Sequence, residues 1–194
     1  MIKRFWLALE AALYGAYLIG DIAGVPVDGL KYAAVAFCAA MAVEIGEPLT
    51  MGALLCSLVA DLFLLFDTRH VLLGVLAFGV VQTLYALWLP DGMGIRALLF
   101  SISLLWLRSP LEIAAAYYFI MLSFNTATAI QRKIPYLAPG LSLLLACDIC
   151  VGLHYIRPAW PLVAYGMWLF YLPGQVCLVL ASSRVGGIGI YERK

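Results

Sequence analysis

The chain has 194 residues, of which 65% are hydrophobic and 12% charged, and its mean hydropathy is +1.00. A soluble domain is typically about 45–50% apolar and about 25% charged, so this composition excludes a cytosolic enzyme and a disordered chain. The formal net charge of +1 gives no basis for binding a phosphate backbone, so no nucleic acid partner is expected. The composition therefore predicts a multi-pass membrane protein.

Eight apolar segments follow one another along the chain, separated by charged, proline and glycine residues. A membrane-spanning helix needs about 20 apolar residues, because each residue rises 1.5 Å and the hydrocarbon core is about 30 Å thick. The connections are short, so we expect an all-α bundle of eight antiparallel transmembrane helices in one domain over residues 1–194. The expected spans are residues 5–22, 30–45, 48–66, 70–89, 93–107, 111–130, 135–156 and 158–181.

The distribution of basic residues predicts the orientation in the cell or inner membrane. Cytoplasmic loops carry an excess of Lys and Arg, and placing the N-terminus inside gives eight basic residues inside against four outside. Both termini are therefore expected in the cytoplasm. The inner set is Lys3, Arg4, Arg96, Arg132, Lys133, Arg184, Arg193 and Lys194, and the outer set is Lys31, Arg69, Arg108 and Arg157.

Cysteines and histidines give little support for redox or metal chemistry. All five cysteines fall inside expected spans, and Cys147-x-x-Cys150 lies in mid-helix, which favours small packing residues over a redox pair. The two histidines, His70 and His154, lie near the ends of different helices without metal-ligand spacing. No metal and no cofactor are expected.

Two acidic residues lie deep within apolar segments, where an ionisable group is costly and usually marks a functional site. Asp61 and Asp148 are each 13 residues from the start of their spans (48 to 61 and 135 to 148), on helices that run in the same direction. They are therefore expected at one depth, facing a shared cavity. The other acids, including Glu10 about one turn from the inner edge, are expected at water-exposed span ends.

The helix that follows each acidic helix carries a polar and aromatic face. Such side chains also join helices by hydrogen bonds, so each of them alone has a structural explanation. As a set beside two acids, they predict a pocket built from two weakly similar, parallel four-helix units. The members are Gly74, Phe78, Gln82 and Tyr85 after Asp61, then Trp168, Tyr171, Gln175 and Ser182 after Asp148, with Tyr118, Asn125 and Thr128 from the sixth span.

Two buried carboxyls can divide the work of acid–base catalysis, because one can stay protonated while the other is ionised. That pair suits proton donation to a poor leaving group together with activation of water. The sequence contains no Gly-x-Ser-x-Gly motif, and neither histidine has an evident serine or cysteine partner. The residues alone leave open a second class, a small proton- or cation-coupled transporter or a lipid-binding protein.

At this point the chain resembles the lysoplasmalogenase family, also called YhhN-like. The resemblance covers about residues 30 to 183 and is strongest from Ser57 to Tyr85. It rests on the order and helical placement of short motifs: Ser57-Leu-Val-Ala-Asp61-Leu-Phe-Leu-Leu-Phe66, Gly74-x3-Phe78-x3-Gln82-x2-Tyr85, Gly140-x6-Cys147-Asp148, Tyr171-x3-Gln175 and Lys31. The chain departs from the family pattern at Ala60, Gln82 and Cys147, where Gly, His and Ser are usual.

The resemblance implies hydrolysis of the vinyl ether bond of lysoplasmalogens, which releases a fatty aldehyde and a glycerophospho-base. Asp61 and Asp148 would be the catalytic pair. The substrate-binding residues would be Lys31, Gln82, Tyr85, Tyr118, Asn125, Tyr171 and Gln175. The expected partners are a lysophospholipid substrate and membrane lipids. An acyl-ester lysophospholipase is a weaker alternative, because the sequence shows no activated nucleophile.

Overall fold

The computed structural model describes residues 2–89, 93–156 and 161–185, and these residues form a purely helical bundle. The prediction of an all-α fold of eight helices is confirmed. The α-helices are α1 (Ile2–Ile22), α2 (Asp28–Ile45), α3 (Pro48–Asp61), α4 (Val71–Trp88), α5 (Met93–Ser103), α6 (Pro110–Gln131), α7 (Leu137–Ile156) and α8 (Pro161–Val185). Residues 158–160, the start of the expected eighth span, lie outside the described residues.

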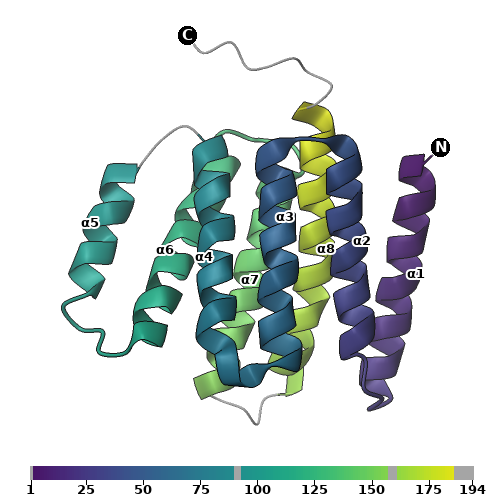
Figure 1. Ribbon diagram of the computed structural model, residues 1–194, viewed down its shortest axis with the longest axis horizontal. Helices are drawn as coiled ribbons and strands as arrows, with labels where there is room; N and C mark the ends of the chain where they lie inside the picture. Colours follow the sequence, from purple (N-terminus) through teal and green to yellow (C-terminus); the bar gives the residue numbers. More distant parts are fainter. Residues whose placement is uncertain (1, 90–92, 157–160, 186–194) are drawn as a thin grey trace.

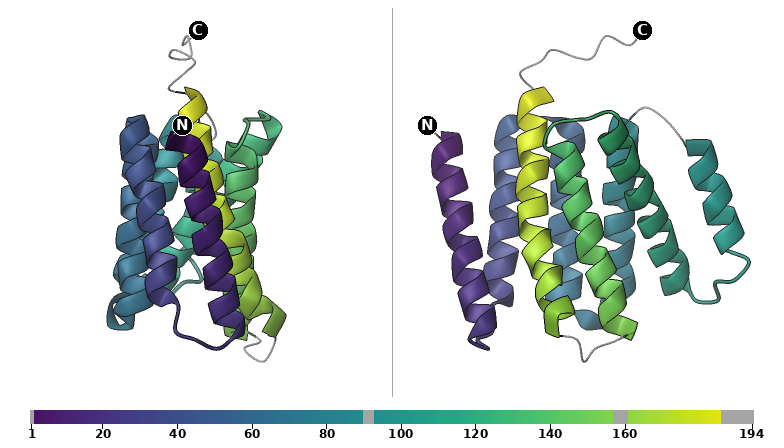
Figure 2. Two further views of the ribbon diagram at one scale, coloured as in Figure 1. Left: turned by 90° about the vertical axis from the view of Figure 1, so that its right-hand side faces the viewer. Right: turned by 180° about the vertical axis from the view of Figure 1, so that it is seen from behind.

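The helices are arranged in two layers, with one helix at each flank. Figure 1 shows α1 and α5 at opposite edges, and the side view in Figure 2 separates α2, α3 and α4 from α6, α7 and α8. Within each half the chain order is kept, because α1 packs on α2, α2 on α3 and α3 on α4, as α5 packs on α6, α6 on α7 and α7 on α8. Across the halves, α2 contacts α8 and α4 contacts α6. This pairing is the one expected of two parallel four-helix repeats.

Local sequence signals explain where several helices begin and end. The Glu47 side chain caps α3 by accepting from the backbone N–H groups of Leu49 and Thr50, at 3.3 and 2.6 Å, and Pro48 occupies the first turn. Ser109 and Glu112 form a capping box at the start of α6. Gly46 ends α2 with φ of 75°, a conformation that glycine adopts at little cost.

The helix that carries Asp61 changes geometry immediately after it. We expected one span over residues 48–66, but the α-helix ends at Asp61 and residues Leu62–Phe66 form a π-helical turn. A 3₁₀ turn, Thr68–His70, then leads into α4. A π turn is rare and is frequently found at functional sites.

The outer surface of the bundle is apolar, as a lipid-facing surface must be. Large side chains such as Phe5, Leu105 and Trp106 are more than 70% exposed. Six helices are long and apolar enough to cross a membrane: α1, α3 with its π turn, α4, α6, α7 and α8. The chain is therefore a multi-pass membrane protein.

The two remaining helices, α2 and α5, differ from the expected spans. The 18 residues of α2 include three charged side chains, Asp28, Lys31 and Glu44, whereas each of the six helices has an apolar stretch of that length with two at most. The fifth expected span, residues 93–107, is wrong at its end: α5 stops at Ser103, and its 11 residues cover only about 17 Å of a core about 30 Å thick.

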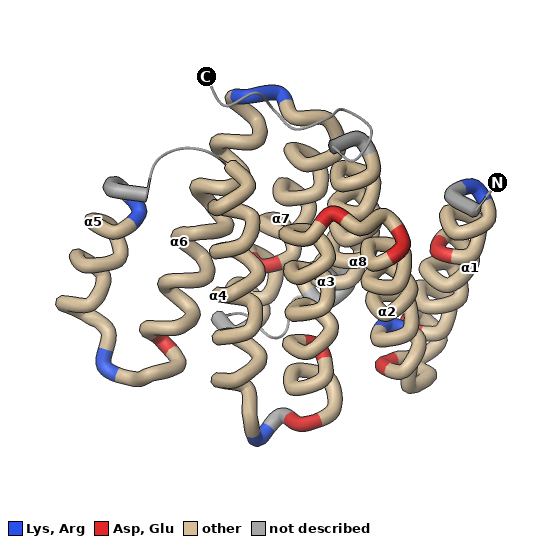
Figure 3. Tube along the Cα trace, turned by 45° about the horizontal axis from the view of Figure 1, so that its top comes forward, with Lys and Arg blue, Asp and Glu red and all other residues tan. Residues whose placement is uncertain are grey.

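Most charged positions lie near the helix ends, as Figure 3 shows. Three described residues contradict the expectation of water-exposed ends: Lys31, which is only 6% exposed, Glu10 and Arg96. Glu10 is only 4% exposed and accepts a hydrogen bond from Cys38, and Arg96, expected at the inner edge, is only 2% exposed. Arg157, Arg193 and Lys194 lie outside the described residues, and the cytoplasmic placement of the termini stays a prediction.

Candidate functional site

A cavity of about 810 Å³ lies between α3, α4, α6, α7 and α8. Its volume falls in the range of ligand-binding cavities, about 300–1,000 Å³. Both predicted acids, Asp61 and Asp148, line this one cavity. The structure therefore brings the two carboxyls of the two repeats to a shared space.

The cavity occupies only one end of the bundle. From α3 and α7, which run in one direction, it takes residues at or after Ser57 and Leu144; from the opposed helices α4, α6 and α8 it takes residues in their first two thirds. The cavity therefore reaches from mid-bundle toward the end where α3 joins α4. Its polar lining is at mid-bundle, whereas the residues nearest that end are apolar: Leu64, Leu65, Val71, Leu111 and Leu153.

Asp61 is held by a tyrosine from the other repeat. It ends the α-helical part of α3, is only 5% exposed, and accepts a hydrogen bond of 2.7 Å on Oδ2 from the Tyr171 hydroxyl of α8. A buried carboxyl without a partner is costly, so this bond fixes its orientation. Among the described residues, Asp61 Oδ1 has no hydrogen-bond partner.

Asp148 has a similar partner but a different setting. It lies in the middle of α7 and is half-buried, and its Oδ2 accepts a hydrogen bond from the Tyr118 hydroxyl of α6. Tyr118 belongs to the same repeat as Asp148, whereas Tyr171 reaches Asp61 from the other repeat. The two acids therefore share a cavity without sharing an environment.

Phe78 packs between the two tyrosines. Its ring centroid lies 5.7 Å from that of Tyr118 and 6.3 Å from that of Tyr171, and Tyr171 also contacts Trp168 edge-on at 6.1 Å. These rings are in the preferred distance range for aromatic pairs. These rings hold the hydroxyls of Tyr118 and Tyr171 in place and surround the two carboxyls with apolar side chains.

Gln82 also lines the cavity, and its side chain belongs to a buried polar chain. Asn125 on α6 donates from Nδ2 to the Gln82 backbone oxygen at 2.8 Å and to Gln82 Oε1 at 3.0 Å. Arg96 on α5 donates from Nη1 to Asn125 Oδ1 at 2.8 Å. Asn125 is therefore behind the cavity wall rather than in its lining.

Three further predicted site residues lie outside the lining. Tyr85 and Gln175 are fully buried between helices. Lys31 is 6% exposed, forms an ion pair of 3.1 Å with Asp28, and places its Nζ 3.7 Å from the ring centroid of Trp168. Trp168 lines the cavity, so the lysine lies on the far side of a cavity wall.

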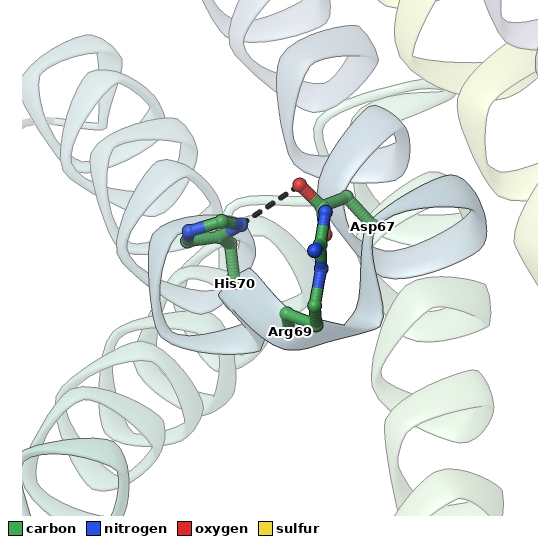
Figure 4. Close-up of polar contacts among 3 residues, drawn as sticks. All are labelled: Asp67, Arg69 and His70. Carbon is green, nitrogen blue, oxygen red and sulfur yellow. Dashed lines mark hydrogen bonds and ion pairs between the residues drawn. The ribbon is translucent and has the colours of Figure 1, made fainter.

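A charged cluster lies where the cavity approaches the bundle end. The turn Thr68–His70 joins two cavity-lining segments, and Figure 4 shows the Asp67 carboxylate facing His70 with the Arg69 side chain alongside it. Asp67 Oδ2 lies 2.8 Å from His70 Nδ1, and Oδ1 lies 3.2 Å from Arg69 Nε. The hydrogen bond with His70, with that of Arg69, lowers the pKa of the Asp67 carboxyl. The cluster offers exposed polar groups beside an apolar opening.

Sequence reasoning missed Arg96 and Ser57. Arg96 was assigned to the inner membrane edge, because a basic residue three positions into a helix normally reaches water. Its contact with Asn125 depends on how α5 packs against α6, which hydropathy does not encode. Ser57 lies one turn before Asp61 on the same face, and that spacing was the available signal.

The comparisons with known proteins agree with the motifs. The family model described as the YhhN family matches residues 28–182, which is most of the chain and includes every cavity-lining residue. No match is found among curated proteins or among solved structures. The resemblance drawn from Asp61, Asp148 and their neighbouring helices is thereby confirmed, and the chain belongs to the YhhN family.

Proposed function

We propose that this protein is an intramembrane hydrolase that cleaves the vinyl ether bond of lysoplasmalogens, giving a fatty aldehyde and a glycerophospho-base. The observation that carries the proposal is the placement of Asp61 and Asp148 in one cavity whose lining is otherwise almost entirely apolar. Membership of the YhhN family supports it.

The reaction needs a proton and a water molecule, and two carboxyls can manage both. One carboxyl protonates the β-carbon of the vinyl ether, and the resulting oxocarbenium ion is stabilised by the other, as carboxylate. That carboxylate also orients the water that adds to the cation, and the hemiacetal collapses to aldehyde and alcohol. In sum, R–CH=CH–O–R′ and water give R–CH₂–CHO and HO–R′.

The depth of the acids determines how a membrane lipid would have to reach them. Asp61 precedes the end of the π turn at Phe66 by five residues (61 to 66), and Asp148 precedes the end of α7 at Ile156 by eight (148 to 156). At 1.5 Å per residue the acids lie about 8 and 12 Å below the helix ends. Each of these two helical segments is about 30 Å long, the thickness of the hydrocarbon core, so the acids lie about 8 and 12 Å inside it and a lipid linkage reaches them only by entering the cavity.

The lining also suits a single-chain amphiphile. The mostly apolar lining accommodates a hydrocarbon chain, and the exposed Arg69 and His70 beside the bundle end can meet a phosphate. An amphiphile can reach such a cavity without leaving the bilayer.

The test compares three lipids that differ only at carbon 1: an alkenyl, an acyl and an alkyl lysophosphocholine. Purified protein is expected to release aldehyde from the alkenyl lipid alone. In D₂O the aldehyde should carry one deuterium on carbon 2, because the β-carbon takes the proton. An Asp61→Asn, Asp148→Asn double variant should be inactive, and Asp21→Asn, on α1 and outside the cavity lining, is the matched control.

Two other results would each reject this proposal and indicate a different function. Fatty acid released from the acyl lipid, with no aldehyde from the alkenyl lipid, indicates a lysophospholipase. Activity on none of the lipids, with proton-coupled uptake in vesicles, indicates the transporter class.

A further inference from the structure

The side chain of Arg96 is buried without a carboxylate partner among the described residues. It extends from the short helix α5 and is only 2% exposed. Its Nη1 donates to Asn125 Oδ1 at 2.8 Å, and no hydrogen bond is recorded for its Nε or Nη2 within the described part of the chain. Burying a guanidinium for one amide contact is expensive, so the contact calls for an explanation.

Arginine can only donate hydrogen bonds, and this fixes the orientation of Asn125. The Asn125 oxygen must face Arg96, which leaves Nδ2 facing α4. Both Nδ2 protons have acceptors there, the backbone oxygen and the Oε1 of Gln82, at 2.8 and 3.0 Å. A flipped Asn125 would set its oxygen against the Gln82 backbone oxygen and its NH₂ against the guanidinium.

The same logic fixes the amide of Gln82. Its Oε1 faces the Asn125 donor, so its Nε2 points away from Asn125. Gln82 is 1% exposed and lines the cavity, and its Nε2 has no acceptor in the described structure. The Nε2 atom is itself buried, and a buried N–H without a partner costs about 1–3 kcal/mol, so an acceptor on an occupant that approaches Gln82 would relieve this cost.

We infer that Arg96 and Asn125 are positioning residues that set the polarity of a three-residue relay, so that Gln82 donates from Nε2 to an oxygen of the glycerol part of a lysophospholipid in the cavity. The class of ligand rests on the proposed function. The donor itself rests on the geometry of the relay. Gln82 then contributes to substrate affinity rather than to proton transfer.

A purely structural role for Arg96, docking α5 onto α6, is the competing explanation. Asn125→Asp separates the two roles. The aspartate still accepts from Arg96, so α5 stays docked, but it cannot donate to Gln82. Gln82 then turns its Nε2 toward the new carboxylate and withdraws the donor from the cavity.

Nuclear magnetic resonance can follow the donor directly. The chain has one asparagine, Asn125, and three glutamines, at positions 82, 131 and 175. Selective ¹⁵N labelling of glutamine therefore gives three side-chain amide signals, and Gln82→Leu assigns one of them. The probe is 1-O-hexadecyl-sn-glycero-3-phosphocholine, which has no vinyl bond and is not consumed.

In the wild type, the Gln82 amide signal should shift as the lipid binds. Asn125→Asp should move this signal before lipid is added, abolish its response to lipid and raise the Kd about tenfold, the loss of one hydrogen bond. Arg96→Lys, which keeps a donor, should restore most of the affinity that Arg96→Met loses. In a Gln82→Leu background, Asn125→Asp should add nothing further, because Asn125 acts through Gln82.

An unshifted Gln82 signal on lipid binding, or an unchanged Kd in a folded Asn125→Asp variant, overturns the relay. Failure of the wild type to bind the lipid overturns it as well. If the Gln82 signal responds to lipid but no aldehyde is released from the alkenyl lipid, the relay is retained and the proposed hydrolysis is rejected. If aldehyde is released but the Gln82 signal does not respond, the relay alone is rejected.

Discussion

The two acid sites, one in each repeat, differ although the helices that surround them pack in the same order. Asp61 is almost fully buried, takes its tyrosine from the other repeat and is followed by a π turn. Asp148 is half-buried, takes its tyrosine from its own repeat and lies within a continuous α-helix. A repeated framework thus places two carboxyls at one cavity, and the neighbouring side chains make them different.

The difference is visible in the paired positions of α4 and α8. Each helix has an aromatic residue four positions before its glutamine, Phe78 before Gln82 and Tyr171 before Gln175. Only Tyr171 carries a hydroxyl, and it bonds to Asp61. A single oxygen atom therefore distinguishes the two halves, which is consistent with separate roles for the two acids.

Removing either carboxyl should have the largest effect. We expect Asp61→Asn and Asp148→Asn each to reduce aldehyde release by at least about a hundredfold, the contribution of a general acid or base. The measurement is kcat/KM on the alkenyl lipid. If one variant keeps its activity, the two halves do not share the chemistry.

Removing the tyrosine hydroxyls should separate the two sites. Tyr171→Phe leaves the buried Asp61 without its donor, whereas water can replace the Tyr118 hydroxyl at the more exposed Asp148. We expect kcat/KM to fall about tenfold or more for Tyr171→Phe and only a few-fold for Tyr118→Phe. Equal losses would show that burial does not distinguish the acids.

Helix spacing beside Asp61 should be sensitive to one methyl group. A Cβ at Gly74 would lie 2.8 Å from Leu64 Cγ and 3.1 Å from the Ala60 backbone oxygen, whereas a Cβ at Gly15 meets nothing within 4 Å. Gly74→Ala should therefore destabilise the protein by about 1–3 kcal/mol and lower activity by moving α3. Thermal melting in detergent measures this, with Gly15→Ala as the control that should melt as the wild type does.

The exposed cluster near the bundle end should contribute least. The pKa of Asp67 is lowered in the folded protein, so its contribution to stability is complete above the unfolded pKa, about 3.9, and is lost as the pH falls through the folded value. Asp67→Asn should lower Tm slightly at pH 6, and the difference from wild type should shrink below about pH 3.9 and vanish once the pH is below the folded pKa of Asp67. A difference that grows on acidification would contradict the assignment.

Much of the site could be read from the sequence, because the cost of burying a charge in lipid singles out a few positions. Asp61 and Asp148, which hydropathy places deep in their helices, do line one cavity, and so do Gln82, Tyr118 and Tyr171. Lys31 and Asn125 could not be placed in this way. A lysine near a span end can reach water or stack on a tryptophan, and only packing decides between them.

The amino-acid sequence by itself determined the class of protein, the eight helices and the two buried acids, since hydropathy and helical periodicity follow from local composition. The tertiary structure decided which tyrosine meets which acid, that α3 ends in a π turn, and that Arg96 turns inward to Asn125. These are contacts between helices distant in the chain. Their geometry depends on the shapes of side chains on two helices at once, so it cannot be derived from the sequence of either helix alone.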